Sequence, residues 1–167
     1  WQAYARAPKF ATGYDAAAAY VLEHSTSPTV FFDGYNNGYF TYFMRAQDPE
    51  RSMWVLRGDK LLTSTSIAGR NMLEVHIDDA EGIDALLDRF GPQFIVVESR
   101  NTIKLPAHAV LRQHLDASAD YQLRKTIPVD TGEPSTREPL ADLDLLIYEH
   151  VDRPQPTGGV LELRLPV

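Results

Sequence analysis

The sequence predicts an α/β fold, a three-layer α/β sandwich with a Rossmann-like, mostly parallel sheet and an antiparallel C-terminal extension. In the first part of the chain, helical patterns alternate with short apolar runs, which is typical of parallel strands connected by helices that pack on the sheet. Later, three strand-like segments follow one another with no helical pattern between them. These segments are expected to be antiparallel or to lie at a sheet edge.

The first helix is expected to begin at a capping box, in which Thr12 is the N-cap and Asp15 lies three positions later. An alanine-rich run favours its continuation to about Glu23. The next expected elements are a strand over residues 29–32, a helix capped by Asn36 or Asn37 that ends before Asp48-Pro49, and a strand over residues 53–56.

Residues 60–70 are rich in Ser, Thr and Gly and predict a loop, and the alternating Leu73, Val75 and Ile77 predict a short extended segment. A second capping box, from Asp78 to Glu81, predicts a helix that Gly91-Pro92 ends. The remaining expected elements are a strand over 94–97, a helix that begins at Pro106 and presents Val110, Leu111 and Leu115, strands over 121–127, 143–148 and 160–165, and a long surface loop over 128–140.

Composition restricts the possible classes of protein. A length of 167 residues, with 44% hydrophobic and 23% charged residues, predicts one soluble domain over residues 12–167. Residues 1–11 are expected to be an entry segment from an upstream region, because the chain opens at Trp1 without an initiator methionine and is therefore expected to be a piece of a longer protein or a processed product. Sixteen basic and twenty-three acidic residues give a net charge of −7, and the basic residues are scattered, so no nucleic-acid partner is expected.

Polar and glycine residues follow the first predicted strand, from Asp33 to Gly38. Gly34 could let the backbone approach a ligand, and free N–H groups near Asn36 and Asn37 could bind an anion or a sugar oxygen. The alternative is a tight strand-to-helix turn at Gly34 and Gly38, with the asparagines as helix caps. Both interpretations remain open at the level of sequence.

Aromatic residues are concentrated in the same segment. Phe40 and Phe43 are expected in the core, whereas Tyr35 and Tyr39 are candidates for exposure, because a tyrosine tolerates a solvated edge. The two tyrosines could stack on the apolar face of a sugar ring.

Charged residues follow the second predicted strand at Arg57, Asp59 and Lys60, and a later strand ends at Glu98, close to Arg100. Carboxyl ends of parallel strands meet at one edge of a sheet, so these side chains could line one crevice and bind a phosphate or a carboxylate. The alternative is a solvated ion-pair network without chemistry, and the sequence does not decide between them.

No pattern predicts a catalytic residue, a metal site or a cofactor. The chain has no cysteine, which excludes disulfides, thiolate metal ligands and cysteine nucleophiles. Its five histidines lack the spacing of metal ligands, and no G-x-S-x-G elbow, dinucleotide fingerprint or phosphate-binding loop occurs.

Two segments carry a resemblance to a known family. FFDGYNNGYFTYFMRAQDPERSMWVLRGDKLL and the later FGPQFIVVES are similar to the soluble C-terminal domain of bacterial family 39 membrane glycosyltransferases, the dolichyl-phosphate-mannose-protein mannosyltransferase-like group. The similarity covers about residues 12–100. It implies a polytopic parent enzyme that uses a polyprenyl-phosphate-linked sugar, with this domain on the extracytoplasmic side.

The resemblance also implies partners, namely the membrane portion of the same parent chain and a lipid-linked sugar or its acceptor. Catalytic carboxylates of that family commonly occur as an adjacent Asp-Glu pair, which this chain lacks, so the domain is expected to be noncatalytic. The alternatives are a stand-alone Rossmann-like domain that binds a sugar or nucleotide at the Asp33 and Arg57 loops, and a structural interaction domain with an exposed apolar patch.

Overall fold

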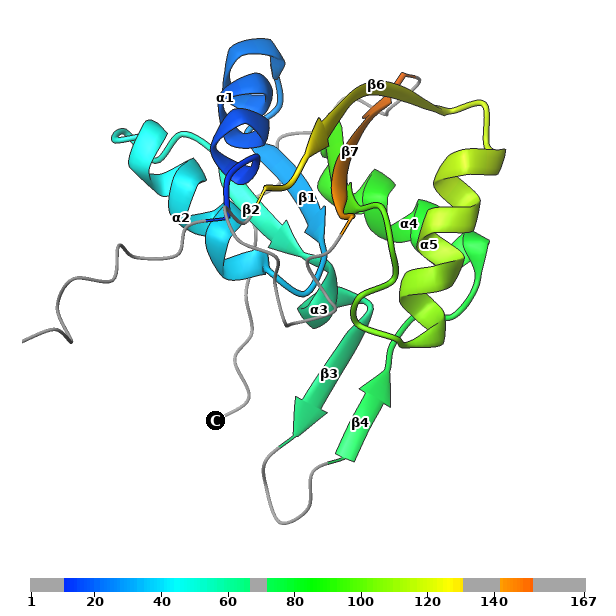
Figure 1. Cartoon of the computed structure of the whole chain (residues 1–167). Helices are drawn as coiled ribbons and strands as arrows, with labels where there is room; N and C mark the ends of the chain where they lie inside the picture. The colour runs from blue at the N-terminus through cyan, green and yellow to red at the C-terminus, as the bar shows by residue number, and fades with distance from the viewer. Residues whose placement is uncertain (1–10, 67–71, 131–141, 152–167) are drawn as a thin grey trace, which may run out of the picture.

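The computed structural model describes residues 11–66, 72–130 and 142–151 (Figure 1). The elements are, in order, α1 (Tyr14–His24), β1 (Thr29–Asp33), α2 (Asn37–Gln47), β2 (Trp54–Arg57), α3 (Gly58–Leu61), β3 (Thr63–Ser66), β4 (Met72–Val75), α4 (Ala80–Phe90), β5 (Phe94–Glu98), α5 (Pro106–Ala117), β6 (Tyr121–Pro128) and β7 (Asp144–His150). None of the helices in these ranges has the length and apolar character needed to cross a bilayer.

A five-stranded sheet with the order β2-β1-β5-β7-β6 forms the centre of the fold. Strands β2, β1 and β5 are parallel, whereas β7 is antiparallel to both β5 and β6. The predicted α/β class is therefore confirmed, as is the antiparallel pairing of the two later strands. The strand predicted at 160–165 lies outside the described residues, as does most of the loop predicted at 128–140.

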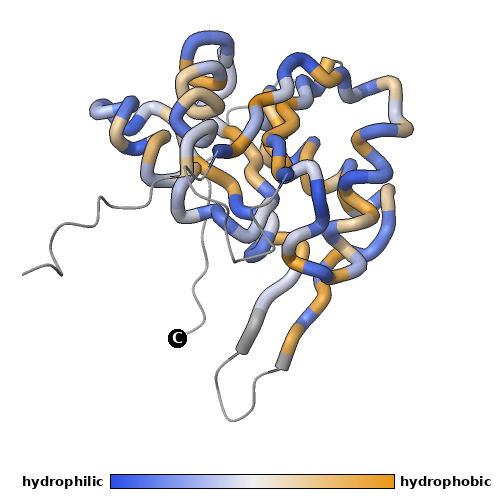
Figure 2. The backbone as a smooth tube through the Cα atoms, in the orientation of Figure 1, coloured by the Kyte–Doolittle hydropathy of each residue, from blue (hydrophilic) through white to orange (hydrophobic). Residues whose placement is uncertain are grey.

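The two faces of the sheet contribute to separate hydrophobic clusters. Val30 and Phe32 of β1 pack with α1 and α2, whereas Phe31 between them packs with α4 and α5. This alternation follows from the two-residue repeat of a strand. All five residues of β5 are buried, because the strand lies between neighbours and has helices near both faces. Figure 2 shows hydrophobic and hydrophilic residues alternating along the helices.

The first helix begins one residue later than a Thr12 N-cap requires. Gly13 holds the N-cap position with φ of 100°, and its N–H donates to Asp15 Oδ1 at 2.9 Å. Thr12 instead forms a β-bridge with Asp130, and its hydroxyl donates to the Asp130 carbonyl. A side chain at position 13 would also meet the Pro128 carbonyl oxygen at 2.6 Å, so only glycine suits this conformation and this contact.

The prediction of a loop over 60–70 was wrong for its first residues. A short helix, α3, follows β2 directly, and Thr63–Ser66 forms β3, which pairs antiparallel with β4. Cross-strand hydrogen bonds satisfy the backbone of this Ser- and Thr-rich segment, and local composition does not reveal such a partner. The hairpin projects from the body of the molecule in Figure 1, and Leu73 and Val75 on β4 are exposed.

The remaining helices begin close to the predicted positions. Asp79, one residue after the predicted start, is the N-cap of α4 and accepts from the Gly82 N–H at 2.8 Å. Gly91 ends that helix in the left-handed region with φ of 56°. Pro106 is the first residue of α5, as its fixed φ and missing N–H predict.

Candidate functional site

The carboxyl ends of β1 and β5 meet where the chain changes direction across the sheet. Strand β2 lies on one side of β1 and β5 on the other, and Asp33 at the end of β1 is in register with Val97. Ligands of open α/β sheets usually bind at such a switch point. The loop from β1 to α2 and the loop from β5 to α5 both begin here, so these segments contain the candidate site.

Glu98, the last residue of β5, occupies the centre of this position and is fully buried. Its Oε1 accepts from the Tyr14 hydroxyl at 2.9 Å, from the Asn36 N–H at 3.0 Å and from the Asn36 Nδ2 at 3.1 Å. Its Oε2 accepts from the Tyr35 N–H at 3.0 Å and from the Thr102 hydroxyl. Five hydrogen bonds therefore stabilise one buried carboxylate, which joins α1, the start of α2 and the loop after β5.

An internal carboxylate thus takes the place that a ligand anion would take at the start of α2. Two backbone N–H groups of the loop that leads into this helix donate to Glu98, at the kind of strand-to-helix turn where many α/β proteins bind phosphate. Gly34 makes the close approach possible, since a Cβ at this position would lie 2.4 Å from Glu98 Cδ. Burial, and then the charge of Glu98, raise the pKa of Tyr14, so this phenol remains a donor to the carboxylate.

Asp33 is the centre of a second buried network. His108 Nδ1 lies 2.6 Å from Asp33 Oδ1, and Arg112 Nη1 lies 2.6 Å from Oδ2. Arg112 also donates to the main-chain oxygens of Asp33, His108 and Glu98, at 3.2, 2.7 and 2.8 Å. Gly58 packs directly on this carboxylate, because a Cβ there would lie 2.2 Å from Asp33 Oδ1. The network holds the ends of β1 and β5 against α5.

The side chains of Asp33, His108 and Thr63 lie in a row in space, in the order of the acid, base and hydroxyl nucleophile of a catalytic triad. The Thr63 hydroxyl lies 3.4 Å from His108 Nε2, which is long for a hydrogen bond. Asp33 and His108 are fully buried, and Thr63 is nearly so. A nucleophile must reach its substrate, so this arrangement serves packing and orientation and does not form an open catalytic site.

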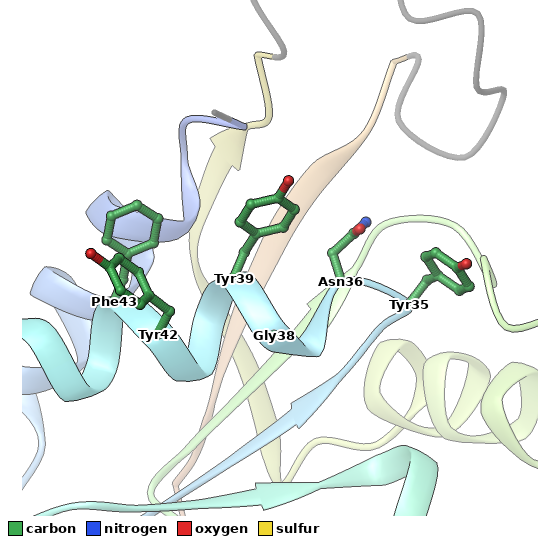
Figure 3. A pocket seen from close by; sticks show the side chains of 6 residues that line it. All are labelled: Tyr35, Asn36, Gly38, Tyr39, Tyr42 and Phe43. Atoms are coloured by element: carbon green, nitrogen blue, oxygen red, sulfur yellow. The ribbon is translucent and has the colours of Figure 1, made fainter. Parts of the chain in front are cut away.

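A pocket opens beside these networks, along the first two turns of α2, with a volume of about 490 Å³. Its lining residues are Tyr35, Asn36, Gly38, Tyr39, Tyr42 and Phe43 (Figure 3). Tyr35 is 64% exposed and Tyr42 63% exposed. The lining contains four aromatic rings and an amide, and no charged side chain.

The inner side of the pocket packs against the hydrophobic core. Tyr39 packs against the core beneath α1, and its ring centroid lies 5.6 Å from that of Tyr14. Tyr42 and Phe43 form an edge-to-face pair with centroids 5.2 Å apart. Asn36 is held by its bonds to Glu98, which leave its side-chain oxygen as an acceptor. The buried Glu98 network therefore holds Asn36 and the Tyr35 backbone at one end of the open pocket.

The structure brings together only some of the residues that the sequence suggested for ligand binding. Tyr35, Asn36 and Tyr39 line the pocket, and Asn37 begins α2 beside it. Gly34 is buried beneath this loop, and Asp33 has no exposed side-chain surface. Asn36 holds the N-cap position, but its side chain bonds Glu98 and not the helix backbone.

The charged residues predicted for the same crevice do not line the pocket. Arg57 donates from Nε and Nη2 to both oxygens of Asp59, at 2.9 and 2.7 Å, and these side chains are 38% and 23% exposed. This is the partly solvated ion pair that was the alternative for these two residues. Lys60 and Arg100 are exposed, and neither lines the pocket.

Sequence reasoning missed His108 and Arg112, although a signal was present. On α5, positions 108, 111, 112 and 115 share one face, at the spacing of a buried stripe. Two polar residues within such a stripe need buried partners, and Asp33 is the partner of both. No sequence pattern pointed to Tyr14, because its partner Glu98 is 84 positions away.

In the parts of the chain that the structure describes, no group of three or more His, Cys, Asp or Glu side chains is arranged to hold a metal ion. Comparison of the chain with models of protein families, with curated proteins and with solved structures finds no match.

Proposed function

We propose that the chain is a noncatalytic, extracytoplasmic soluble domain of a polytopic membrane glycosyltransferase that transfers sugar from a polyprenyl-phosphate donor. The observation that carries the proposal is an open aromatic pocket at the start of α2 whose lining contains no carboxylate, histidine, lysine or arginine. The pocket lies within the segment that resembles the family 39 enzymes. Such a site can bind a sugar, but it lacks the carboxylate or histidine that most often transfers a proton or attacks the substrate in hydrolases and transferases.

The burial of the nearby carboxylates supports the noncatalytic part of the proposal. Asp33 and Glu98 are both fully buried, and each has several hydrogen-bond partners. Neither presents an oxygen to the pocket. In this proposal, transfer takes place in the membrane portion of the parent chain, and the domain is a Rossmann-like three-layer sandwich that contributes a binding surface.

The position of the domain can be tested by labelling, because the chain contains no cysteine. Ala119, exposed between α5 and β6, is replaced by cysteine in the full-length protein in its native membrane. A membrane-impermeant maleimide should label Ala119→Cys in intact cells, and the unsubstituted protein corrects for cysteines elsewhere in the parent. Labelling only after the cells are lysed would contradict an extracytoplasmic location.

Catalysis is tested separately with the isolated chain and a polyprenyl-phosphate-linked sugar. We expect no transfer to acceptor peptides or to water above the rate without protein. Transfer that depends on the chain would refute the noncatalytic assignment. The gene that encodes the chain provides a further check, because the proposal requires several apolar stretches of about 20 residues in the same reading frame.

The second candidate is a stand-alone Rossmann-like domain that binds a sugar or a nucleotide. The switch point between β1 and β5 favours such a function in general. The Glu98 carboxylate favours the sugar over the nucleotide, because it already accepts from two N–H groups beside the start of α2 and its charge repels a phosphate there. A reading frame that encodes no membrane segments would support this candidate over the transferase domain.

A further inference from the structure

We propose that the α2 pocket binds a neutral pyranose ring, recognised through its C–H face and its hydroxyl groups, and that it excludes the phosphate part of a sugar phosphate. The inference rests on the proposed function and deepens it, because it names the class of ligand and the part of a glycolipid that the domain contacts.

The aromatic rings supply the apolar half of the recognition. Tyr35 and Tyr42 are mostly exposed at the two ends of the pocket, with Tyr39 between them along α2. An exposed tyrosine ring presents a large apolar face at a low cost in side-chain entropy. One face of a pyranose carries several C–H groups and packs well on such a ring. Exposed aromatics around one pocket are therefore suited to a flat, partly apolar ligand.

Hydrogen-bonding groups supply the polar half. Among the described residues, the hydroxyls of Tyr35, Tyr39 and Tyr42 make no hydrogen bond, and the Asn36 amide keeps an oxygen available. A pyranose offers several hydroxyls that can donate to and accept from these groups. An isoprenoid chain would leave them unpaired on desolvation, which disfavours a purely apolar ligand. The mixture of rings and neutral polar groups therefore favours a sugar over a lipid tail.

The size of the pocket agrees with a ligand of this class. Small-molecule sites commonly have volumes of about 300–1,000 Å³, and the α2 pocket has about 490 Å³. This volume accommodates one or two sugar rings with part of their water. The packed inner wall, formed by Tyr39 and Phe43, means that little reorganisation is needed on binding.

Charge decides against the phosphate. No lysine or arginine lines the pocket, so a phosphate there would have no ion-pair partner. The N–H groups of Tyr35 and Asn36, which could bind an anion, already donate to Glu98. An anion at this position would also be repelled by that carboxylate. A sugar phosphate should therefore gain nothing from its phosphate.

The test is a titration of the 167-residue chain, followed by NMR chemical-shift changes, with matched probes. The probes are methyl pyranosides of glucose, mannose and galactose, the corresponding pyranose 1-phosphates, inorganic phosphate, and cyclohexanol as a ring with one hydroxyl. At least one methyl pyranoside should bind with a dissociation constant on the order of millimolar. Its 1-phosphate should bind no more tightly, inorganic phosphate should not bind, and cyclohexanol should bind at least tenfold more weakly.

Variants assign the binding to the pocket. Tyr35→Ala and Tyr42→Ala should each weaken the affinity about threefold to tenfold, because each removes one exposed ring. Tyr39→Phe keeps the ring and removes a hydroxyl, so it tests the polar contribution. Trp54→Ala is the matched control, because Trp54 is also exposed, at 57%, but belongs to β2 and does not line the pocket. It should leave the affinity unchanged.

Three results would overturn the inference. They are the absence of binding by every methyl pyranoside, tighter binding of the 1-phosphate, and equal losses in Trp54→Ala and the pocket variants. None of them decides the proposed function. That proposal is refuted if the isolated chain transfers sugar, or if a cysteine at position 119 is labelled only after the cells are lysed. The two claims can therefore be refuted independently.

Discussion

Arg112→Ala should lower the free energy of unfolding of this protein more than the removal of a charged side chain from the surface. The guanidinium makes four hydrogen bonds, and its ion-pair partner, Asp33, is fully buried. Removal of one partner from a buried pair leaves an uncompensated charge, which typically costs about 3–5 kcal/mol. A domain of this size is commonly stable by about 5–15 kcal/mol, so the loss would be a large fraction of the total.

Urea unfolding followed by far-UV circular dichroism measures this effect. With an m-value of about 2 kcal/mol/M, the midpoint should fall by about 2 M while the m-value stays constant. Arg57→Ala is the matched control, because Arg57 also pairs with a carboxylate, through two hydrogen bonds to Asp59, but both side chains are partly exposed. Such a pair contributes about 0.2–1 kcal/mol.

A double-mutant cycle separates the buried charge from the lost packing. Asp33→Asn removes the negative charge and keeps the shape, so Arg112→Ala should cost less in that background than in the wild type. If Arg112→Ala and Arg57→Ala destabilise the protein equally, the Asp33 network does not hold the strand ends together as argued. Equal costs of Arg112→Ala in both backgrounds would show that the ion pair itself contributes nothing.

Three further outcomes follow from particular contacts. Gly34→Ala should lower the free energy of unfolding by about 1–3 kcal/mol, because its methyl group would overlap Glu98. Gly38→Ala, where the space is open, should be neutral or stabilise α2 by up to about 1 kcal/mol. Chemical denaturation compares the two variants, and equal effects would contradict the argument. Asp48 has its pKa lowered below 3.8, chiefly by the hydrogen bond from the Met53 N–H, so its contribution to stability is present above pH 3.8 and is lost as the pH falls through the lowered value. Asp48→Asn should therefore be less stable than the wild type at neutral pH, and denaturation midpoints measured down the acid range should converge; a constant difference would refute the linkage. Burial raises the pKa of Tyr14, Tyr121 and Tyr148 above the ordinary value of 10.0. The stability that these buried neutral phenols contribute is therefore present below pH 10.0 and is lost as the pH rises above it. In a spectrophotometric titration, native protein should form less tyrosinate than urea-unfolded protein at the same alkaline pH, and identical curves would contradict the buried environments.

Local patterns were sufficient to predict the elements whose residues interact within a few positions. The helices near Asn37, Ala80 and Pro106 began within two residues of their predicted starts. The signals that predicted them, the Asp79 cap of α4, the first-position proline of α5 and the apolar stripes, act over one or two turns. The buried run at residues 94–97 is a strand within the sheet, as its continuous apolar character indicates. Predictions of this kind depend on no distant partner.

The short strand β3 shows the opposite case. Its Ser and Thr residues are compatible with a loop, and only the antiparallel partner β4 makes them a strand. The strand order was also beyond local patterns, because β7 enters between β5 and β6 after a long connection. Pairing between distant segments depends on which edges remain available when the chain folds, and composition does not encode this.

The candidate site likewise has features that local patterns predict and features that depend on contacts between distant segments. Its aromatic segment and two of its tyrosines were evident from the sequence alone, since Tyr35 and Tyr39 lie beside glycines and asparagines at a predicted strand end. Tyr42 was not predicted, and Phe43, expected in the core, packs against it but is only partly buried and lines the pocket. Only the tertiary structure decided that Glu98, more than 60 residues away, takes the N–H groups of that loop, and that Asp33 is committed to α5. Hydrogen bonds act over about 3 Å in space, whatever the separation along the chain, so which polar group is open to a ligand is settled by the packing of distant segments.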